Sequence, residues 1–228
     1  MKVGVLTFHH TTNFGATLQM AGLIYELERL GHKVEVVNYR PYRAIAVYMR
    51  HNLMTKWAFN NVRKIRKMRD FVHQSASLSP RIYLTHRLQR LQHRYDAVIV
   101  GSDEVWNVDS FRGFDSAYFL DFVGSSTRRI SYAASAGSAA PTSFSQHANA
   151  IQEHLSKFDG ISVRDEHTQA LLRGLGIANK RTVDPSFFLP QVLKLSTSER
   201  VGCESSVIYG TLNEWQSTAV RHHANETN

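Results

Sequence analysis

The sequence predicts an α/β fold, with one parallel, doubly wound sheet over residues 1–190. Short apolar runs that are typical of strands alternate with longer stretches whose apolar residues recur at helical spacing. The first forty residues form a strand, helix and strand pattern, which implies parallel pairing through a right-handed crossover. The run YDAVIVG at 95–101 is apolar throughout, as expected for a strand that is covered on both faces.

Local sequence patterns predict the bounds of the individual strands and helices. Residues 2–8 have the apolar content of a strand, and residues 15–30 predict a helix that Gly31 ends. The next strand ends before Pro41. The remaining expectations are strands at 33–39, 95–101, 129–135, 160–163 and 180–184, and helices at 143–158 and 165–175.

A second domain is expected to begin near the end of the chain. Residues 191–205 are polar and predict a linker, whereas the run SVIYGTL at 206–212 has the pattern of a strand. Only sixteen residues follow that run, too few to build a core. We therefore expect residues 206–228 to be the truncated start of a second domain.

Composition excludes several classes of protein. The chain has 228 residues, of which 43% are hydrophobic and 20% charged, so extensive disorder is not expected. No window of eighteen uncharged apolar residues predicts a spanning helix, and the N-terminus lacks the pattern of a signal peptide. The single cysteine, Cys203, has no partner for an internal disulfide. A cytoplasmic protein is the simplest interpretation.

Residues 40–94, the basic segment, make the whole chain basic. The net charge is +8, but this segment holds thirteen lysines and arginines and one acid, Asp70. Apolar residues at helical spacing between these charges predict a helical excursion with one apolar side and a solvated basic face. An alternative is a surface that binds acidic glycan or an anionic membrane, which would make the protein membrane-peripheral. No nucleic-acid-binding motif accompanies the charge, so nucleic acid is not an expected partner.

Candidate site residues follow three of the predicted strands, because open parallel sheets bind ligands beyond the carboxyl ends of their strands. In the first loop, Thr12 or Asn13 suits a helix cap, and Gly15 allows a ligand to approach the backbone. The helix N-terminus would then offer N–H groups to an anion, although an ordinary cap explains the same residues. The loop matches neither the dinucleotide-binding nor the nucleoside-triphosphate-binding pattern.

The second loop, Gly101–Asn107, carries the candidate base and a candidate surface for stacking a sugar. Asp103 suits a general base, and Ser102 and Asn107 suit substrate binding. Trp106 offers a surface on which a sugar could stack. The alternative is that Ser102 and Asp103 only satisfy the backbone of the loop.

The third loop contributes a cation. Ser162 with Asp165 matches a helix capping box, which leaves Arg164 unexplained. An arginine at the end of a strand beside a helix N-terminus is a natural partner for phosphate or carboxylate. The twelve histidines are scattered and show no ligand spacing, so we assign no metal.

Taken together, these stretches resemble the polysaccharide pyruvyl transferase family. The resemblance spans residues 3–189 in the family's order, through VGVLTFHHTTNFGATLQ, LGHKVEVVNYRP, YDAVIVGSDEVWN, YFLDF with ISYAASAG, and ISVRDEHT with TVDPSFFL. It implies two Rossmann-like domains facing across a cleft, as in GT-B glycosyltransferases, of which this chain holds the N-terminal one. It also implies transfer of pyruvate from phosphoenolpyruvate, as donor substrate and without a cofactor, to two hydroxyls of a sugar or polysaccharide acceptor.

The chemistry that the resemblance implies suits Asp103 as the base, and Arg164 with a helix N-terminus as the groups that bind the donor anion. Family members continue into a second domain, whose Arg-x-His motif is expected to supply a proton to the donor. Arg221-His222-His223 has those letters but lies too early, so we expect no activity from this chain alone. The alternatives are a non-catalytic module that binds an anion or a sugar, and a glycosyltransferase that uses a nucleotide sugar.

Overall fold

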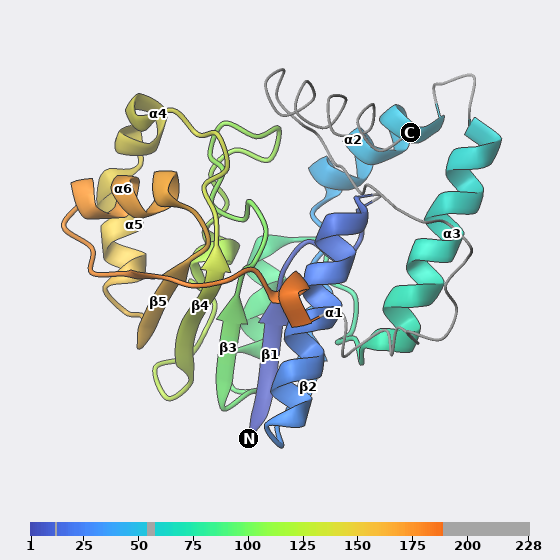
Figure 1. Cartoon of the computed structure of the whole chain (residues 1–228), viewed down its shortest axis with the longest axis horizontal. Coiled ribbons are helices and arrows are strands. Elements are labelled where there is room, and N and C mark those ends of the chain that lie inside the picture. The colour runs from blue at the N-terminus through green and yellow to red at the C-terminus, as the bar shows by residue number, and fades with distance from the viewer. Residues whose placement is uncertain (12, 54–57, 189–228) are drawn as a thin grey trace, which may run out of the picture. The chain divides into compact units, whose positions relative to one another are not determined.

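The computed structural model describes residues 1–11, 13–53 and 58–188. Within these residues, six parallel strands form one sheet in the order β2-β1-β3-β4-β5-β6 (Figure 1). The strands are β1 Lys2–Leu6, β2 Lys33–Val36, β3 Ala97–Val100, β4 Arg128–Ala134, β5 Gly160–Val163 and β6 Lys180–Arg181. The predicted parallel α/β sheet is confirmed, although most strands are shorter than expected.

Five of the six described helices lie in two groups, and α1 lies by itself (Figure 1). The helices α2 and α3 lie beyond β2, and α4 to α6 gather on the side of β5, while α1 runs beside β1. Their bounds are α1 Phe14–Arg29, α2 Tyr42–Leu53, α3 Ala58–Ser75, α4 Pro141–Gln146, α5 Ala148–Leu155 and α6 Glu166–Gly174. Three 3₁₀ turns among the described residues are η1 Thr85–Leu91, η2 Ser116–Phe119 and η3 Pro185–Phe188.

Both faces of the sheet are covered, which explains the continuous apolar run of β3. Val98 and Val100 belong to one buried cluster, together with residues of α5 and α6. Ile99 points the other way and belongs to a second cluster, together with residues of α1 and Val72 of α3. Because successive side chains of a strand alternate between faces, a strand buried on both sides has no polar position.

The single helix expected at 143–158 is instead two helices, α4 and α5, which meet at His147. The hydroxyl of Ser145 donates to the carbonyl oxygen of Pro141 at 2.7 Å, a contact that competes with the helical ladder. His147 leaves the helical conformation and stacks on Phe114 at 4.8 Å between ring centroids. The expected capping box is also wrong. Asp165, and not Ser162, caps α6 by accepting from the Thr168 N–H at 2.7 Å.

The basic segment forms α2, α3 and η1, as the helical pattern predicts, but it also returns to the sheet. Leu78 and Ile82 make isolated parallel bridges with Val36 and Tyr39 at the edge beside β2. Neither Leu78 nor Ile82 belongs to the six strands of the sheet, so these two bridges only tie the segment to the sheet's edge. Met68 and Val72 of α3 are buried, so this helix docks by one apolar side.

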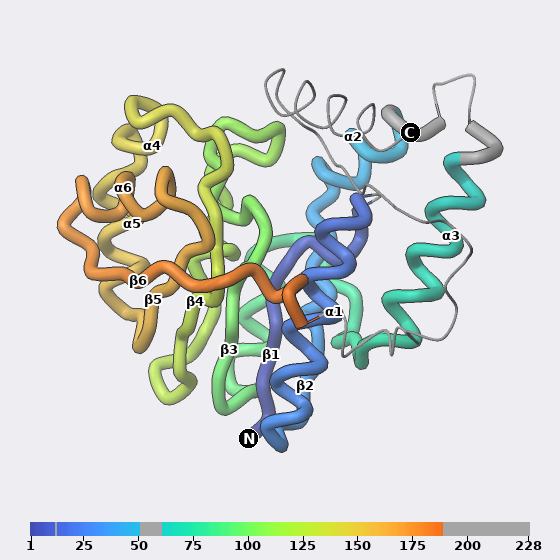
Figure 2. The backbone as a smooth tube through the Cα atoms, viewed as in Figure 1, coloured from blue at the N-terminus to red at the C-terminus, as the bar shows by residue number. Residues whose placement is uncertain are grey.

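After β6 the chain crosses the carboxyl ends of the strands and packs η3 against α1 (Figure 2). Gly22 of α1 makes this approach possible, because a Cβ there would lie 2.2 Å from the carbonyl oxygen of Pro185. The expected linker at 191–205 and the expected second-domain start at 206–228 lie outside the described residues. No helix in the described ranges combines the length and the apolar character needed to cross a membrane.

Candidate functional site

The strand order changes direction between β1 and β3, since β2 lies on one side of β1 and β3 on the other. Open α/β sheets bind ligands at such a switch point, beyond the carboxyl ends of the strands. The loop after β1 holds Asn13, the loop after β3 holds Asp103, and Arg164 follows β5. All three therefore lie at one edge of the sheet, as predicted.

Asn13 is the cap of α1. Its side-chain oxygen accepts a hydrogen bond from the Gly15 N–H at 2.8 Å, which confirms the predicted cap; Thr12 lies outside the described residues. Both Asn13 and Gly15 are exposed, and the first turn of α1 carries no acid. The helix N-terminus is thus open to an anion, although its predicted binding to one stays a prediction.

Gln19 connects the three loops, and sequence reasoning missed it. It lies one turn after Gly15 on the same face of α1 and is buried. Its side-chain oxygen accepts from the Ser102 hydroxyl at 3.3 Å and from Arg164 Nη1 at 3.2 Å. The only signal in the sequence was a polar residue on the apolar side of a predicted helix.

Arg164 is held at the mouth of β5 by a single nitrogen. Nη1 donates to the side-chain oxygen of Gln19, to the backbone oxygen of Ser102 at 3.1 Å, and to Asp184 Oδ2 at 3.2 Å. No other described residue accepts from Nη2 or Nε, and the side chain is 27% exposed. The guanidinium is therefore oriented by the protein and still has donors for a ligand.

Asp103 lies half-buried in the loop after β3. Burial raises the pKa of its carboxyl above the ordinary 3.8, against the opposing effects of the Glu104 N–H and the positive charges of Arg164 and Arg112. The Glu104 N–H donates to Oδ1 at 2.8 Å. A carboxyl whose pKa is raised by burial has the property expected of a general base.

Trp106 does not face the site. Its side chain is 1% exposed, its ring stacks on Phe119 at 5.7 Å between centroids, and Nε1 donates to the Tyr118 carbonyl at 2.9 Å. The prediction that Trp106 offers a stacking surface to a sugar is therefore wrong, because the core covers the ring.

Ser102 and Asn107 have positioning roles in the loop. Ser102 is buried, and its hydroxyl donates to Gln19 rather than facing solvent. Asn107 Nδ2 donates to Glu104 Oε2 at 2.9 Å, and its Oδ1 accepts from the Asp109 N–H at 3.1 Å. These contacts set the shape of the loop around Asp103, so direct substrate contact by either residue stays a prediction.

Arg112 is a second cation that sequence reasoning missed. Its guanidinium lies over the ring of Phe8, 3.8 Å from the centroid, and donates to the hydroxyl of Tyr48. Its charge acts on Asp103, as described above. A lone arginine in the irregular stretch after β3 carries no motif, so only the fold reveals that it lies near the switch point.

Comparison with known proteins identifies the family. The sequence model of the family described as polysaccharide pyruvyl transferase matches residues 13–225. A crystal structure of FadB2 from M. tuberculosis is 17% identical with a TM-score of 0.30; the match covers 80% of this chain and 63% of that one. No curated protein matches the chain. Because the family match extends over nearly the whole sequence, the chain belongs to the polysaccharide pyruvyl transferase family.

Proposed function

We propose that this chain contributes the donor-binding anion site and the general base of a pyruvyl transferase. The transferred group is the pyruvyl unit of phosphoenolpyruvate, and the product is a cyclic ketal on two hydroxyls of a polysaccharide sugar. The observation that carries the proposal is the family match over residues 13–225, in a chain that places Asp103 and Arg164 at one sheet edge.

The donor requires cationic and N–H groups, because its phosphate and carboxylate lie close together. Arg164 offers Nη2 and Nε, which donate to no described residue, and its Nη1 donates to Gln19 of α1. Gly15 lies one turn before Gln19, about 6 Å along the helix axis, so the open N-terminus of α1 lies on the same side. An anion between these two groups would receive charge-assisted hydrogen bonds from both.

The chemistry assigns a proton transfer to Asp103. One sugar hydroxyl loses its proton to the carboxylate as its oxygen adds to C2 of the donor, while the methylene carbon gains a proton and becomes a methyl group. The bond from C2 to the phosphate oxygen then breaks, and inorganic phosphate leaves. The second hydroxyl attacks C2 and loses its proton to the released phosphate, which closes the ring. The acid that protonates the methylene is not among the residues that we assign.

Binding of the donor tests the proposal without requiring turnover. Titration calorimetry with phosphoenolpyruvate should give a binding isotherm that Arg164→Gln weakens by about tenfold or more. Arg173→Gln removes the same charge from an exposed position of α6 and should change the affinity by less than about twofold.

Two further results would decide between functions. Inorganic phosphate should compete with phosphoenolpyruvate, whereas a uridine nucleotide should not; the opposite order would favour a glycosyltransferase that uses a nucleotide sugar. Equal affinity of Arg164→Gln and the unmodified chain would refute the assigned donor site. Donor binding without release of phosphate from phosphoenolpyruvate in the presence of an acceptor glycan would favour a non-catalytic binding module.

A further inference from the structure

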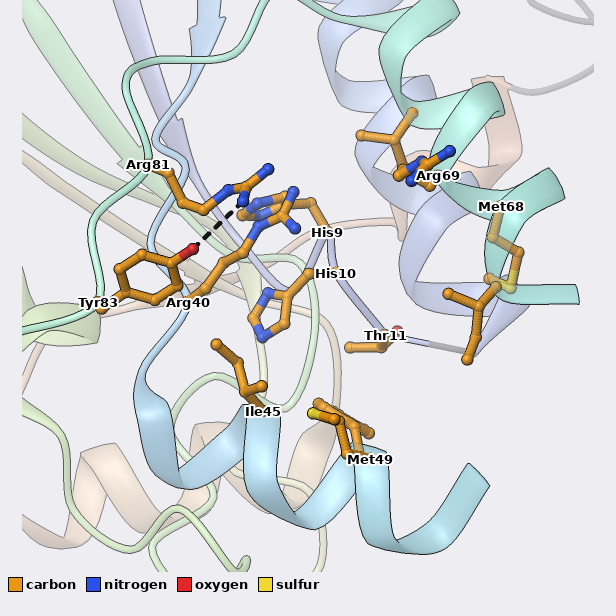
Figure 3. Close-up of a pocket in the computed structure, with 13 residues that line it drawn as sticks. His9, His10, Thr11, Arg40, Ile45, Met49, Met68, Arg69, Arg81 and Tyr83 are labelled. Atoms are coloured by element: carbon orange, nitrogen blue, oxygen red, sulfur yellow. Dashed lines mark hydrogen bonds between the residues drawn. The ribbon is translucent and has the colours of Figure 1, made fainter. Parts of the chain in front are cut away.

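A pocket of about 350 Å³ lies between the basic segment and the carboxyl ends of β1 and β2 (Figure 3). Figure 3 shows His10 and Thr11 from the loop after β1, with Ile45 and Met49 of α2 below them. The volume lies in the range of small-molecule sites, about 300–1,000 Å³. None of the roles assigned above to Asp103, Arg164 and the N-terminus of α1 uses this pocket.

Three arginines line the pocket, and no aspartate or glutamate does so among the described residues. They are Arg40, Arg69 and Arg81. Burial lowers the pKa of Arg40, and the positive charges of Arg81 and Arg69 lower it further, so both of these arginines lie close enough to Arg40 to repel its charge. A bound anion would relieve that repulsion.

Two of these arginines contact only neutral groups within the described chain. Arg40 Nε donates to Asn38 Oδ1 at 2.8 Å, and Arg81 Nη1 donates to the Tyr83 hydroxyl at 3.2 Å, the dashed line in Figure 3. Arg69 differs, since its Nη2 contacts Asp70 at 3.4 Å on the exposed side of α3. Arg40 and Arg81 are therefore oriented by the protein without being neutralised, which is typical of anion sites.

His10 provides an independent observation. Both of its ring nitrogens are buried, and neither has a hydrogen-bond partner among the described residues. A buried polar atom without a partner costs free energy, and such atoms in native proteins mark a missing ligand, water or ion. Burial, with the nearby charges of His9, Arg40 and Arg112, holds the pKa of His10 well below its ordinary value. The neutral ring can thus donate one N–H to a ligand oxygen.

The remaining wall is apolar. Ile45 and Met49 of α2 face the pocket from one helix, and Ile65 and Met68 of α3 face it from the other. Met49 is 55% exposed, and Ile65 is also exposed, although both line a pocket. A sugar would leave these side chains without an apolar partner, whereas a hydrocarbon chain would cover them.

We propose that this pocket binds a phosphate or diphosphate group that carries an apolar chain. Arg40, Arg81 and His10 hold the charged group, and the chain lies against Ile45, Met49 and Met68. The site is separate from Arg164 and does not depend on the function proposed above.

Calorimetry with two probes tests both halves of the site. Geranyl diphosphate should bind at least about tenfold more tightly than inorganic diphosphate, because about 0.8 kcal/mol accompanies each buried CH₂. Arg40→Gln and Arg81→Gln should each weaken both probes by about 10- to 100-fold. Arg81 is exposed, so its variant should fold normally, which an unchanged melting temperature would verify. Met49→Gln should weaken geranyl diphosphate and leave inorganic diphosphate unchanged.

Two controls separate the pocket from its surroundings. Arg66→Gln removes an equal charge from α3 at an exposed position outside the pocket, and should change either affinity by less than about twofold. Arg164→Gln should leave the affinity for geranyl diphosphate unchanged, so binding to the pocket is tested independently of binding to the donor site. An Arg66→Gln effect as large as that of Arg81→Gln would mean that the whole basic face binds anions, as on vesicles of phosphatidylglycerol, and would overturn the proposal. Equal affinity for the two probes would overturn the proposal that the pocket binds an apolar chain.

Discussion

Arg164 Nη1 lies 3.2 Å from Asp184 Oδ2, and this ion pair ties the end of β5 to the turn that leads into η3. The same carboxylate accepts from the Ser186 N–H through Oδ1 at 2.9 Å, so Asp184 both starts η3 and restrains the arginine. The crossing of the chain over the strand ends therefore forms one wall of the proposed donor site.

Asp184→Asn should tighten the binding of phosphoenolpyruvate by about two- to tenfold. The change removes the negative charge beside Arg164 but keeps an oxygen that can accept from Ser186, and Gln19 still orients the guanidinium. Calorimetry on the variant and on the unmodified chain measures the difference. Weaker binding would mean that Asp184 matters more for orienting Arg164 than for competing with the donor.

Gly22→Ala should destabilise the fold by about 1–3 kcal/mol, because the new methyl group would overlap the Pro185 carbonyl and push η3 from α1. Gly174→Ala is the matched control. No neighbouring atom of the described residues lies within 4 Å of a Cβ at Gly174, which ends α6, so alanine there should be neutral or stabilising by up to about 1 kcal/mol. Urea unfolding of both variants gives the comparison.

Asp103→Asn should abolish base function and stabilise the fold at neutral pH. The raised pKa means that the folded protein binds this proton more tightly than the unfolded chain does, so stability is greatest below the unfolded pKa and falls as pH rises through the folded one. Asparagine does not titrate, so the variant does not lose this stability as the pH rises. In urea unfolding from pH 4 to pH 8, the advantage of the variant should therefore grow with pH and then level off. A constant difference would refute the raised pKa.

His9 should make the fold sensitive to acid. Burial lowers the pKa of His9 from 6.5 to about 4, so the folded state resists a proton that the unfolded chain accepts. The stability present above pH 6.5 should decrease between pH 6.5 and pH 4, by up to about 3 kcal/mol from this group. Unfolding curves of His9→Gln should show a smaller loss across that window than the unmodified chain; an equal loss would assign the acid sensitivity to other groups.

Trp106→Ala should destabilise the fold by about 3–5 kcal/mol, because it leaves a cavity beside Phe119 and an unpaired Tyr118 carbonyl. Trp106→Phe keeps most of the packing and should cost less. If Trp106 only fills the core, the phenylalanine variant should show an unchanged KM for the acceptor glycan in an assay of the proposed pyruvyl transfer. A large rise in KM at unchanged melting temperature would restore the stacking role.

Local patterns account for the parts of the site that could be predicted. Asn13 caps α1 because a short polar side chain before an amphipathic run satisfies the free N–H groups of the helix, and Asp103 and Arg164 follow strands whose ends meet at one edge. The prediction that Trp106 stacks on a sugar was wrong because a contact that is distant in the sequence determines its position. Its loop position indicates exposure, but η2 folds over the ring, and no pattern near Trp106 encodes that contact.

The amino-acid sequence by itself determined the parallel α/β architecture, because strand alternation, helix periodicity and burial on both faces are properties of neighbouring residues. Only the tertiary structure decided which side chains meet. Gln19 and Arg164 are 145 residues apart and come together where the chain crosses back to α1. The pocket that Arg40, Arg69 and Arg81 line likewise depends on how α2 and α3 dock beside β2. Such contacts follow from the packing of whole elements against one another, which periodicity along the chain does not specify.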